Sequence, residues 1–296
     1  MSRTLIASAS REVIIGFDQP FRMIGEKINP TNRPKFMAEL RDNCFDTVLS
    51  DALLQAAAGA DILDVNVGVP LADEPALLRE AVLRIQAVCD VPLCIDSSVM
   101  AALEAALPVY QGRALVNSVT GEEESLERML PLVKKYDAAV VAISNDESGI
   151  SMDLDVRFEV AKKIVQRAAD HGIKAQDVVV DPLVMPLGAV NGAGADAFKL
   201  VRRLREELGV NTICGASNVG FGLPERHALT ATFIAMAAGA GMTSAIMGVT
   251  HVEMIRAVRA ANALNGYDEN CRTWIKMARG DAPSEGRVER KRRREG

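Results

Sequence analysis

The chain has 296 residues, of which 49% are hydrophobic, and a formal net charge of -5 at pH 7. This is enough apolar material for one large core, and the acidic balance argues against nucleic acid as a partner. No apolar run is long enough to span a bilayer and the first residues lack a secretory signal, so we expect a cytoplasmic protein that does not bind membranes. Five scattered cysteines without a CxxC pair indicate free thiols in a reducing compartment.

Eight short apolar or β-branched segments alternate with longer segments of helical period. In chain order they are FRMIG near Met23, DILDVNVG near Leu63, PLCIDSS near Ile95, RALVNSV near Val116, AAVVAISND near Val141, DVVVDPL near Val179, TICGASN near Cys214 and SAIMG near Ile246. Several of them are apolar throughout, as a parallel sheet buried on both faces requires. The pattern predicts an α/β fold, a single (β/α)8 TIM barrel over residues 1–280, with a doubly wound open sheet as the alternative.

The last residues of the chain, 281–296, include the basic run RVERKRRREG. Short charged ends without apolar residues usually remain solvated, so we expect a disordered tail. Contact with RNA or with an acidic partner is the alternative for this segment.

Short polar side chains follow six of the eight predicted strands. They are Asp64 and Asn66, then Asp96, Ser97 and Ser98, then Asn117 and Ser118, then Ser144, Asn145 and Asp146, then Asp181, and finally Ser217 and Asn218. The carboxyl ends of barrel strands converge on the mouth where ligands bind, so these residues together predict one polar site. Each of them alone could instead cap a helix or form a turn.

The residue types of this rim indicate the ligand. Carboxylates accept paired hydrogen bonds from an amino-pyrimidinone and carboxamides both donate and accept, which suits a pterin ring. Neither GxxxxGK[ST] nor GxGxxG is present to hold a phosphate. The histidines, His171, His227 and His251, are far apart in the sequence, so we expect no metal site, with Mg²⁺ on carboxylates as the alternative.

Seven ordered segments between about Met23 and Met277 resemble those of a known family. They are IGEKIN, ADILDVNVG, PLCIDSS, ALVNSV, SNDESGI, VVVDPLVMP and GASNVGFGLPER. In these segments the chain resembles the methyltetrahydrofolate:corrinoid methyltransferases, pterin-binding barrels related to the folate domain of cobalamin-dependent methionine synthase and, more distantly, to dihydropteroate synthase. The lysine and the late Arg-x-His signature of dihydropteroate synthases are missing, and Ser217, Asn218 and Val219 stand where that lysine would lie. The resemblance therefore implies a reduced folate as substrate.

The resemblance also implies roles for individual residues. Asp96, Asn117 and Asp181 would hold the pyrimidine part of the pterin, with Asp64 behind them. Asn218, in the tripeptide SNV, would hydrogen-bond near N5 and, with Asp181, would be catalytic. The full set of implied pterin-binding residues is Glu26, Asn29, Asp64, Asp96, Asn117, Asn145, Asp181, Ser217 and Asn218. Arg226 matches a motif position without an assigned role.

The expected reaction moves the N5 methyl group between methyltetrahydrofolate and the cobalt of a corrinoid (cobalamin). A methyl group on a neutral amine is a poor electrophile, so N5 must be protonated or strongly hydrogen-bonded before the methyl leaves. The chain lacks a DxHxxG cobalamin signature, so we expect a separate corrinoid protein as partner, in a split methionine synthase or a demethylation pathway. The family further implies a homodimer.

Two alternatives to this function remain. A dihydropteroate synthase-like pterin enzyme would share the pocket but needs a cationic group for pyrophosphate. A non-catalytic folate-binding subunit would keep the pterin contacts and would not need Asn218.

Overall fold

The computed structural model describes residues 2–280, so the basic tail lies outside the described residues. Its main feature is a ring of eight parallel strands: β3 (Arg22–Ile28), β4 (Ile62–Val65), β5 (Leu93–Asp96), β6 (Leu115–Thr120), β7 (Ala139–Ile143), β8 (Val178–Asp181), β9 (Asn211–Thr212) and β10 (Ser244–Met247). They pair in chain order and β10 pairs with β3. Just past β9, a parallel bridge between Gly215 and Ile246 closes the ring, and the Ile246 N–H donates to the Cys214 carbonyl at 2.8 Å. The predicted TIM barrel, with all eight strands, is confirmed.

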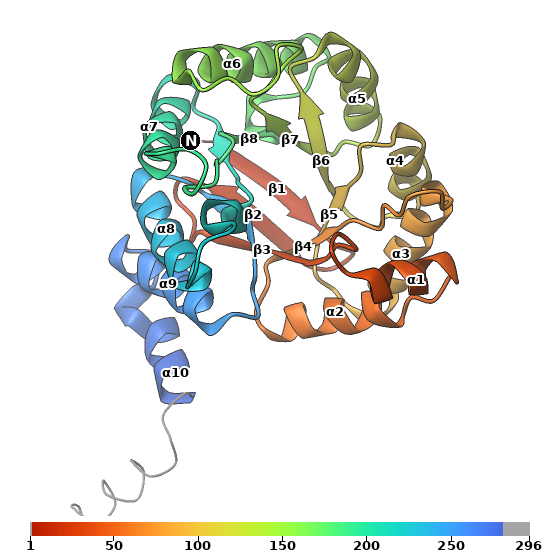
Figure 1. Ribbon diagram of the computed structural model, residues 1–296, viewed down its shortest axis with the longest axis horizontal. Coiled ribbons are helices and arrows are strands. Elements are labelled where there is room, and N and C mark those ends of the chain that lie inside the picture. Colours follow the sequence, from red (N-terminus) through yellow and green to blue (C-terminus); the bar gives the residue numbers. More distant parts are fainter. Residues whose placement is uncertain (1, 281–296) are drawn as a thin grey trace, which may run out of the picture.

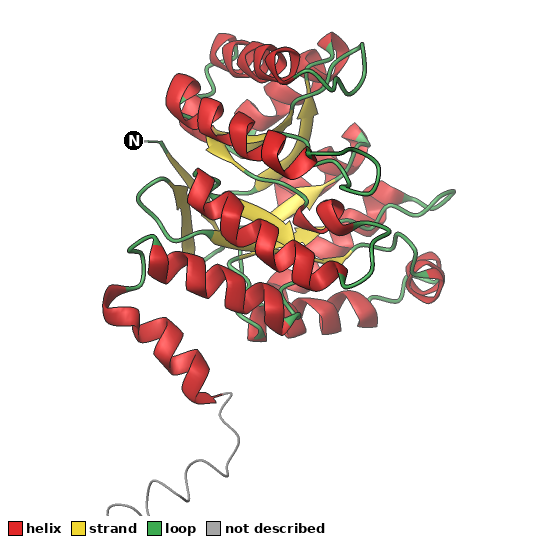
Figure 2. Ribbon diagram, turned by 60° about the vertical axis from the view of Figure 1, so that its left-hand side comes forward, coloured by secondary structure: helices red, strands yellow, loops and turns green. Residues whose placement is uncertain are grey.

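Helices surround the barrel, as Figure 1 shows. They are α1 (Pro34–Arg41), α2 (Asp46–Ala57), α3 (Glu74–Val88), α4 (Met100–Ala106), α5 (Glu123–Lys135), α6 (Leu154–Asp170), α7 (Ala193–Arg203), α8 (Arg226–Ala240) and α9 (Val252–Leu264), followed by α10 (Arg272–Gly280), which extends away from the barrel (Figure 2). None of the helices within residues 2–280 combines the length and the apolarity needed to cross a bilayer.

An N-terminal hairpin, which the sequence analysis did not identify, closes one end of the barrel. Its strands β1 (Arg3–Ala7) and β2 (Glu12–Gly16) are antiparallel. Ile6 and Ile15 are fully buried and pack against inward-facing barrel residues such as Ile62 and Leu115. The hairpin therefore fills the N-terminal end of the barrel with apolar side chains, and the opposite end is left for a ligand (Figure 1).

Strand alternation separates the barrel interior from the surrounding layer of helices. In β4, Ile62 belongs to the interior cluster with the hairpin, while Leu63 and Val65 belong to the larger cluster under the helices. Because side chains alternate between the two faces of a strand, Asp64 follows Ile62 on the inward face. The two-residue period of the sequence thus places an acidic side chain directly above an apolar one.

Candidate active site

The mouth of the barrel carries a layer of polar side chains, which we call the polar layer. Five strands, β4 among them, carry a polar residue two positions beyond an inward-facing apolar residue. The pairs are Ile24 and Glu26, Ile62 and Asp64, Cys94 and Asp96, Leu115 and Asn117, and Val179 and Asp181. On β7 the corresponding residue is Ile143, which is apolar and packs against the interior cluster. The polar layer is therefore acidic at β3, β4, β5 and β8, carries a carboxamide at β6 and is apolar at β7.

Carboxamides orient the two carboxyl groups at the centre of this layer. The Asn117 Nδ2 donates to Asp64 Oδ1 at 3.3 Å, and the Asn66 Nδ2 donates to Asp96 Oδ2 at 3.0 Å. The Asn66 Oδ1 in turn accepts from the Gly68 backbone N–H at 2.9 Å, which fixes the orientation of that amide. Asp64 and Asp96 are thereby held at the barrel mouth with oxygens still available as acceptors.

A short 3₁₀ helix, Ala216–Gly220, carries Ser217 and Asn218 beyond β9. The Ser217 hydroxyl donates to both carboxyl oxygens of Glu26 at 2.9 Å, so this helix is joined to β3 across the closure of the barrel. Asn218 lies against Gly215, where an added Cβ would be 3.0 Å from Asn218 Nδ2. Its side-chain amide makes no hydrogen bond to any of residues 2–280 and lines a cavity. The Asn218 amide is therefore available to a ligand.

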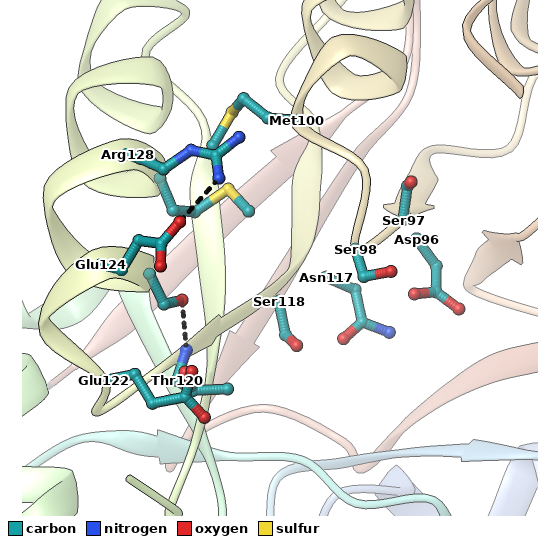
Figure 3. A pocket seen from close by; sticks show the side chains of 12 residues that line it. Asp96, Ser97, Ser98, Met100, Asn117, Ser118, Thr120, Glu122, Glu124 and Arg128 are labelled. Carbon is teal, nitrogen blue, oxygen red and sulfur yellow. Dashed lines mark hydrogen bonds and ion pairs between the residues drawn. The ribbon is translucent and has the colours of Figure 1, made fainter. Parts of the chain in front are cut away.

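Two cavities meet at Asp96 and Asn117. The central cavity, of about 740 Å³, is lined by residues that include Glu26, Asp64 and Asn218 together with both shared residues. The β5–β6 cavity, of about 380 Å³, extends from the same two residues towards Met100 and Arg128 (Figure 3). A planar ring bound against Asp96 and Asn117 would lie in the central cavity with Asn218 on its wall.

Burial gives the carboxyl groups of the polar layer unusual proton affinities. Burial raises the pKa of Asp96 to about 6; the bond from Asn66 opposes this rise and the nearby Glu74 charge adds to it. Burial and the Asp96 charge hold the pKa of Asp64 well above its usual range. Burial also raises the pKa of Asp181 to about 7, against the Leu183 N–H and the Arg157 charge. The barrel mouth therefore contains groups that exchange protons near neutral pH, which is typical of catalytic sites.

Some of the residues implied by the resemblance lie outside the two cavities. Glu26, Asn29, Asp64, Asp96, Asn117 and Asn218 line the central cavity. Asp181 lines neither cavity, and its Oδ1 accepts from the Leu183 N–H at 2.8 Å. Ser217 acts through Glu26. Asn145 also lines neither cavity and lies two residues beyond Ile143, past the end of β7. Direct pterin contacts from Asp181, Ser217 and Asn145 remain predictions.

The structure adds residues that the sequence analysis missed. They are Lys27, Arg33 and His251, which line the central cavity. Asn66, which the sequence placed at the rim without a role, orients Asp96. Two of the three histidines meet although they are far apart in the sequence, because the ring centroids of His227 and His251 are 3.9 Å apart. These two residues lie at the starts of α8 and α9, which converge at the mouth.

The described part of the chain, residues 2–280, contains no group of three or more His, Cys, Asp or Glu side chains arranged to hold a metal ion.

Comparison with known proteins agrees with this geometry. Residues 25–248 match the model of the pterin binding enzymes. A methylcorrinoid:tetrahydrofolate methyltransferase of Eubacterium limosum is 33% identical over 261 residues, which cover 87% of this chain and 96% of that protein.

Solved structures support the fold. The dihydropteroate synthase of Xanthomonas albilineans in complex with 7,8-dihydropteroate superposes with a TM-score of 0.65 at 21% identity, covering 90% of this chain and 99% of that one. The Yersinia pestis enzyme superposes with a TM-score of 0.64 at 17% identity, covering 88% and 99%. These distant structures show the fold, whereas the family match over residues 25–248 and the relative at 33% identity show the family. The chain therefore belongs to the pterin-binding enzymes and, among them, to the family of methyltetrahydrofolate:corrinoid methyltransferases.

Proposed function

We propose that this protein moves a methyl group between N5 of tetrahydrofolate and the cobalt of a corrinoid carried by a separate protein. The observation that carries the proposal is the position of the free Asn218 amide in one cavity with Asp64, Asp96 and Asn117. The identity of 33% to a methyltransferase named for methylcorrinoid and tetrahydrofolate supports it. That name gives transfer towards tetrahydrofolate, and the same site serves both directions because forward and reverse transfer share one transition state.

The central cavity has the groups that a pterin requires. The amino-pyrimidinone edge presents adjacent N–H donors, for which the Asp96 carboxylate is a bidentate acceptor. The Asn117 Nδ2 donates to Asp64, so the Asn117 Oδ1 would accept from the pterin edge. The apolar side chain of Ile246 also lines the cavity and offers a surface to the ring face. We assign the pyrimidine to Asp96 and Asn117, with Asp64 supporting Asn117.

Asn218 and Asp181 would control the charge at N5. In transfer towards tetrahydrofolate, the N5 lone pair forms the new bond to the methyl carbon, the cobalt–carbon pair stays with cobalt, and N5 releases its proton. In the reverse direction N5 must accept a hydrogen bond or a proton as the methyl leaves. The Asn218 amide can donate that hydrogen bond, and Asp181, with a pKa of about 7, can hold the proton at neutral pH. Asp181 lies near the segment that follows β9, because its charge adds to the effect of burial in raising the pKa of the Cys214 thiol.

Replacement of Asn218 by alanine tests the catalytic part of the proposal. We expect Asn218→Ala to reduce kcat for methyl transfer by about 10²- to 10³-fold, as loss of one transition-state hydrogen bond does, while methyltetrahydrofolate binds within a few-fold of wild type. Asn265→Ala, at the C-terminal end of α9 and outside both cavities, is the matched control. Unchanged kcat in Asn218→Ala would leave a non-catalytic folate-binding subunit as the better account. Production of dihydropteroate from a pterin pyrophosphate and p-aminobenzoate would favour the dihydropteroate synthase alternative.

A further inference from the structure

The central cavity has opposite charges at its two sides. The side formed by β4, β5 and β6 carries Asp64, Asp96 and Asn117 of the polar layer. The other side, which we call the cationic edge, is formed by loops after β3, β9 and β10. The cations of this edge are Lys27, Arg33 and Arg226. His251 lies beside them, and burial lowers its pKa, which favours the neutral ring. A ligand that fills this cavity therefore meets acceptors at one end and donors at the other.

The ion pairs of the cationic edge leave positive charge unmatched. The Lys27 Nζ lies 3.1 Å from Asp51 Oδ1 and the Arg33 Nη1 lies 2.8 Å from Asp51 Oδ2, so two cations share one buried carboxylate. The Arg226 guanidinium forms no hydrogen bond or ion pair with any side chain in residues 2–280, and acts on Glu26 only at longer range. The edge therefore has more cationic groups than its one shared carboxylate, Asp51, neutralises, and it attracts anions.

Two features of the backbone and the cavity wall add to this preference. Helix α8 begins at Arg226 and helix α9 begins at Val252, directly after His251, so the positive ends of two helix dipoles lie at the edge. Gln55 also lines the cavity; its Oε1 accepts from the Lys27 N–H at 2.9 Å, and its buried Nε2 has no acceptor within the described residues. The Gln55 amide is thus a further donor on this wall.

We propose that the cationic edge, with Arg226 as its main contact, binds the carboxylates of the glutamyl tail of the folate and so selects folates over simple pterins. This inference rests on the proposed function. A folate is a molecule with ring N–H donors at one end and carboxylates at the other, which matches the two sides of the cavity. Arg226 is exposed at the cavity opening. It can therefore contact a glutamyl tail that leaves the cavity, and the further carboxylates of a polyglutamate tail would lie near the same positive charges.

Calorimetric titration with three ligands tests the proposal: 5-methyltetrahydrofolate, its triglutamate, and a 5-methyltetrahydropterin without the tail. We expect Arg226→Gln to weaken both tailed ligands by roughly three- to tenfold and to leave the tail-less ligand within about twofold of wild type. In the wild type, the affinity advantage of the tail should shrink as salt rises to roughly 0.3 M, and in Arg226→Gln it should depend much less on salt. Arg128→Gln, which removes the cation of the β5–β6 cavity, should keep the wild-type advantage of the tail.

Three results would overturn the inference. Equal weakening of tailed and tail-less ligands by Arg226→Gln would make Arg226 a general structural residue. Loss of the tail advantage in Arg128→Gln alone would place the tail in the β5–β6 cavity. An Arg226→Gln defect seen only in methyl transfer from a corrinoid protein would assign Arg226 to an acidic group of that partner. If the wild type binds none of the three ligands, the proposed function itself fails.

Discussion

Replacement of Asp96 by asparagine tests how the barrel mouth holds the pterin. Asparagine keeps the shape of the side chain and removes the charge of an acceptor that already receives one bond from Asn66 at 3.0 Å. Hydrogen bonds to charged groups contribute about 1.5 to 3 kcal/mol, so the dissociation constant for methyltetrahydrofolate at pH 7.5 should rise by about 10- to 150-fold. The variant should fold, because removal of the Asp96 charge also removes a cause of the raised pKa of Asp64.

Titration calorimetry measures this effect, with thermal unfolding as the check on folding. Asp146→Asn is the matched control, because Asp146 also follows a barrel strand but lies outside both the central and the β5–β6 cavities. The control should bind within about twofold of wild type. If a folded Asp96→Asn variant bound methyltetrahydrofolate as tightly as the control, the pyrimidine would not lie against Asp96 and the assignment of the cavity would be wrong.

Three further predictions follow from proton affinities and close packing. Because the pKa of Asp96 is raised to about 6, its acceptor carboxylate is lost as pH falls below 6, so calorimetry should show weaker folate binding at pH 5 than at pH 7.5 in wild type and little pH dependence in Asp96→Asn. The pKa of Asp181 rises from an ordinary value of 3.8 to about 7 on folding, so the stability from its protonated form is complete below pH 3.8 and is lost as pH rises through 7. Asp181→Asn should therefore increase the free energy of unfolding by up to about 4 kcal/mol at pH 8 and by little at pH 4, and equal urea midpoint shifts at both pH values would contradict this. Gly215→Ala should displace Asn218, whose Nδ2 is 3.0 Å from the added Cβ, and reduce kcat by about tenfold or more without lowering the unfolding midpoint, and an unchanged kcat would show that the position of Asn218 is not critical.

The barrel and its polar layer could be predicted because both depend on local patterns. Apolar strand segments identified all eight barrel strands, and strand-end residues such as Asp64 and Asp96 identified the mouth. The hairpin of β1 and β2 was missed although its buried residues alternate, because two short strands near a terminus give a weak signal. The sequence also did not show how far along its strand each polar residue lies. Asn145 lies two residues beyond Ile143, which is the residue of β7 that pairs with Asp181 of β8, so Asn145 lies past the polar layer.

The cationic edge could not be predicted, because it depends on how separate loops converge. Lys27 lies at the end of β3 and Arg33 follows it, Arg226 begins α8 after β9, and His251 follows β10. The pairing of β10 with β3 and the bridge between Gly215 and Ile246 bring these loops together, and the rings of His227 and His251 meet there. Charges on loops carry no periodic signal, so a sequence reveals their identity and not their neighbours.

The measurement that tests the central claim most directly is calorimetric titration of the wild-type protein with methyltetrahydrofolate, followed in the same samples by absorbance spectroscopy after addition of reduced free cobalamin. The account predicts saturable binding at one site per chain and formation of methyl-cobalamin that depends on the protein. Absence of binding would contradict the pterin site, and binding without any transfer, either to free cobalamin or to a corrinoid protein, would contradict the assignment as a methyltransferase.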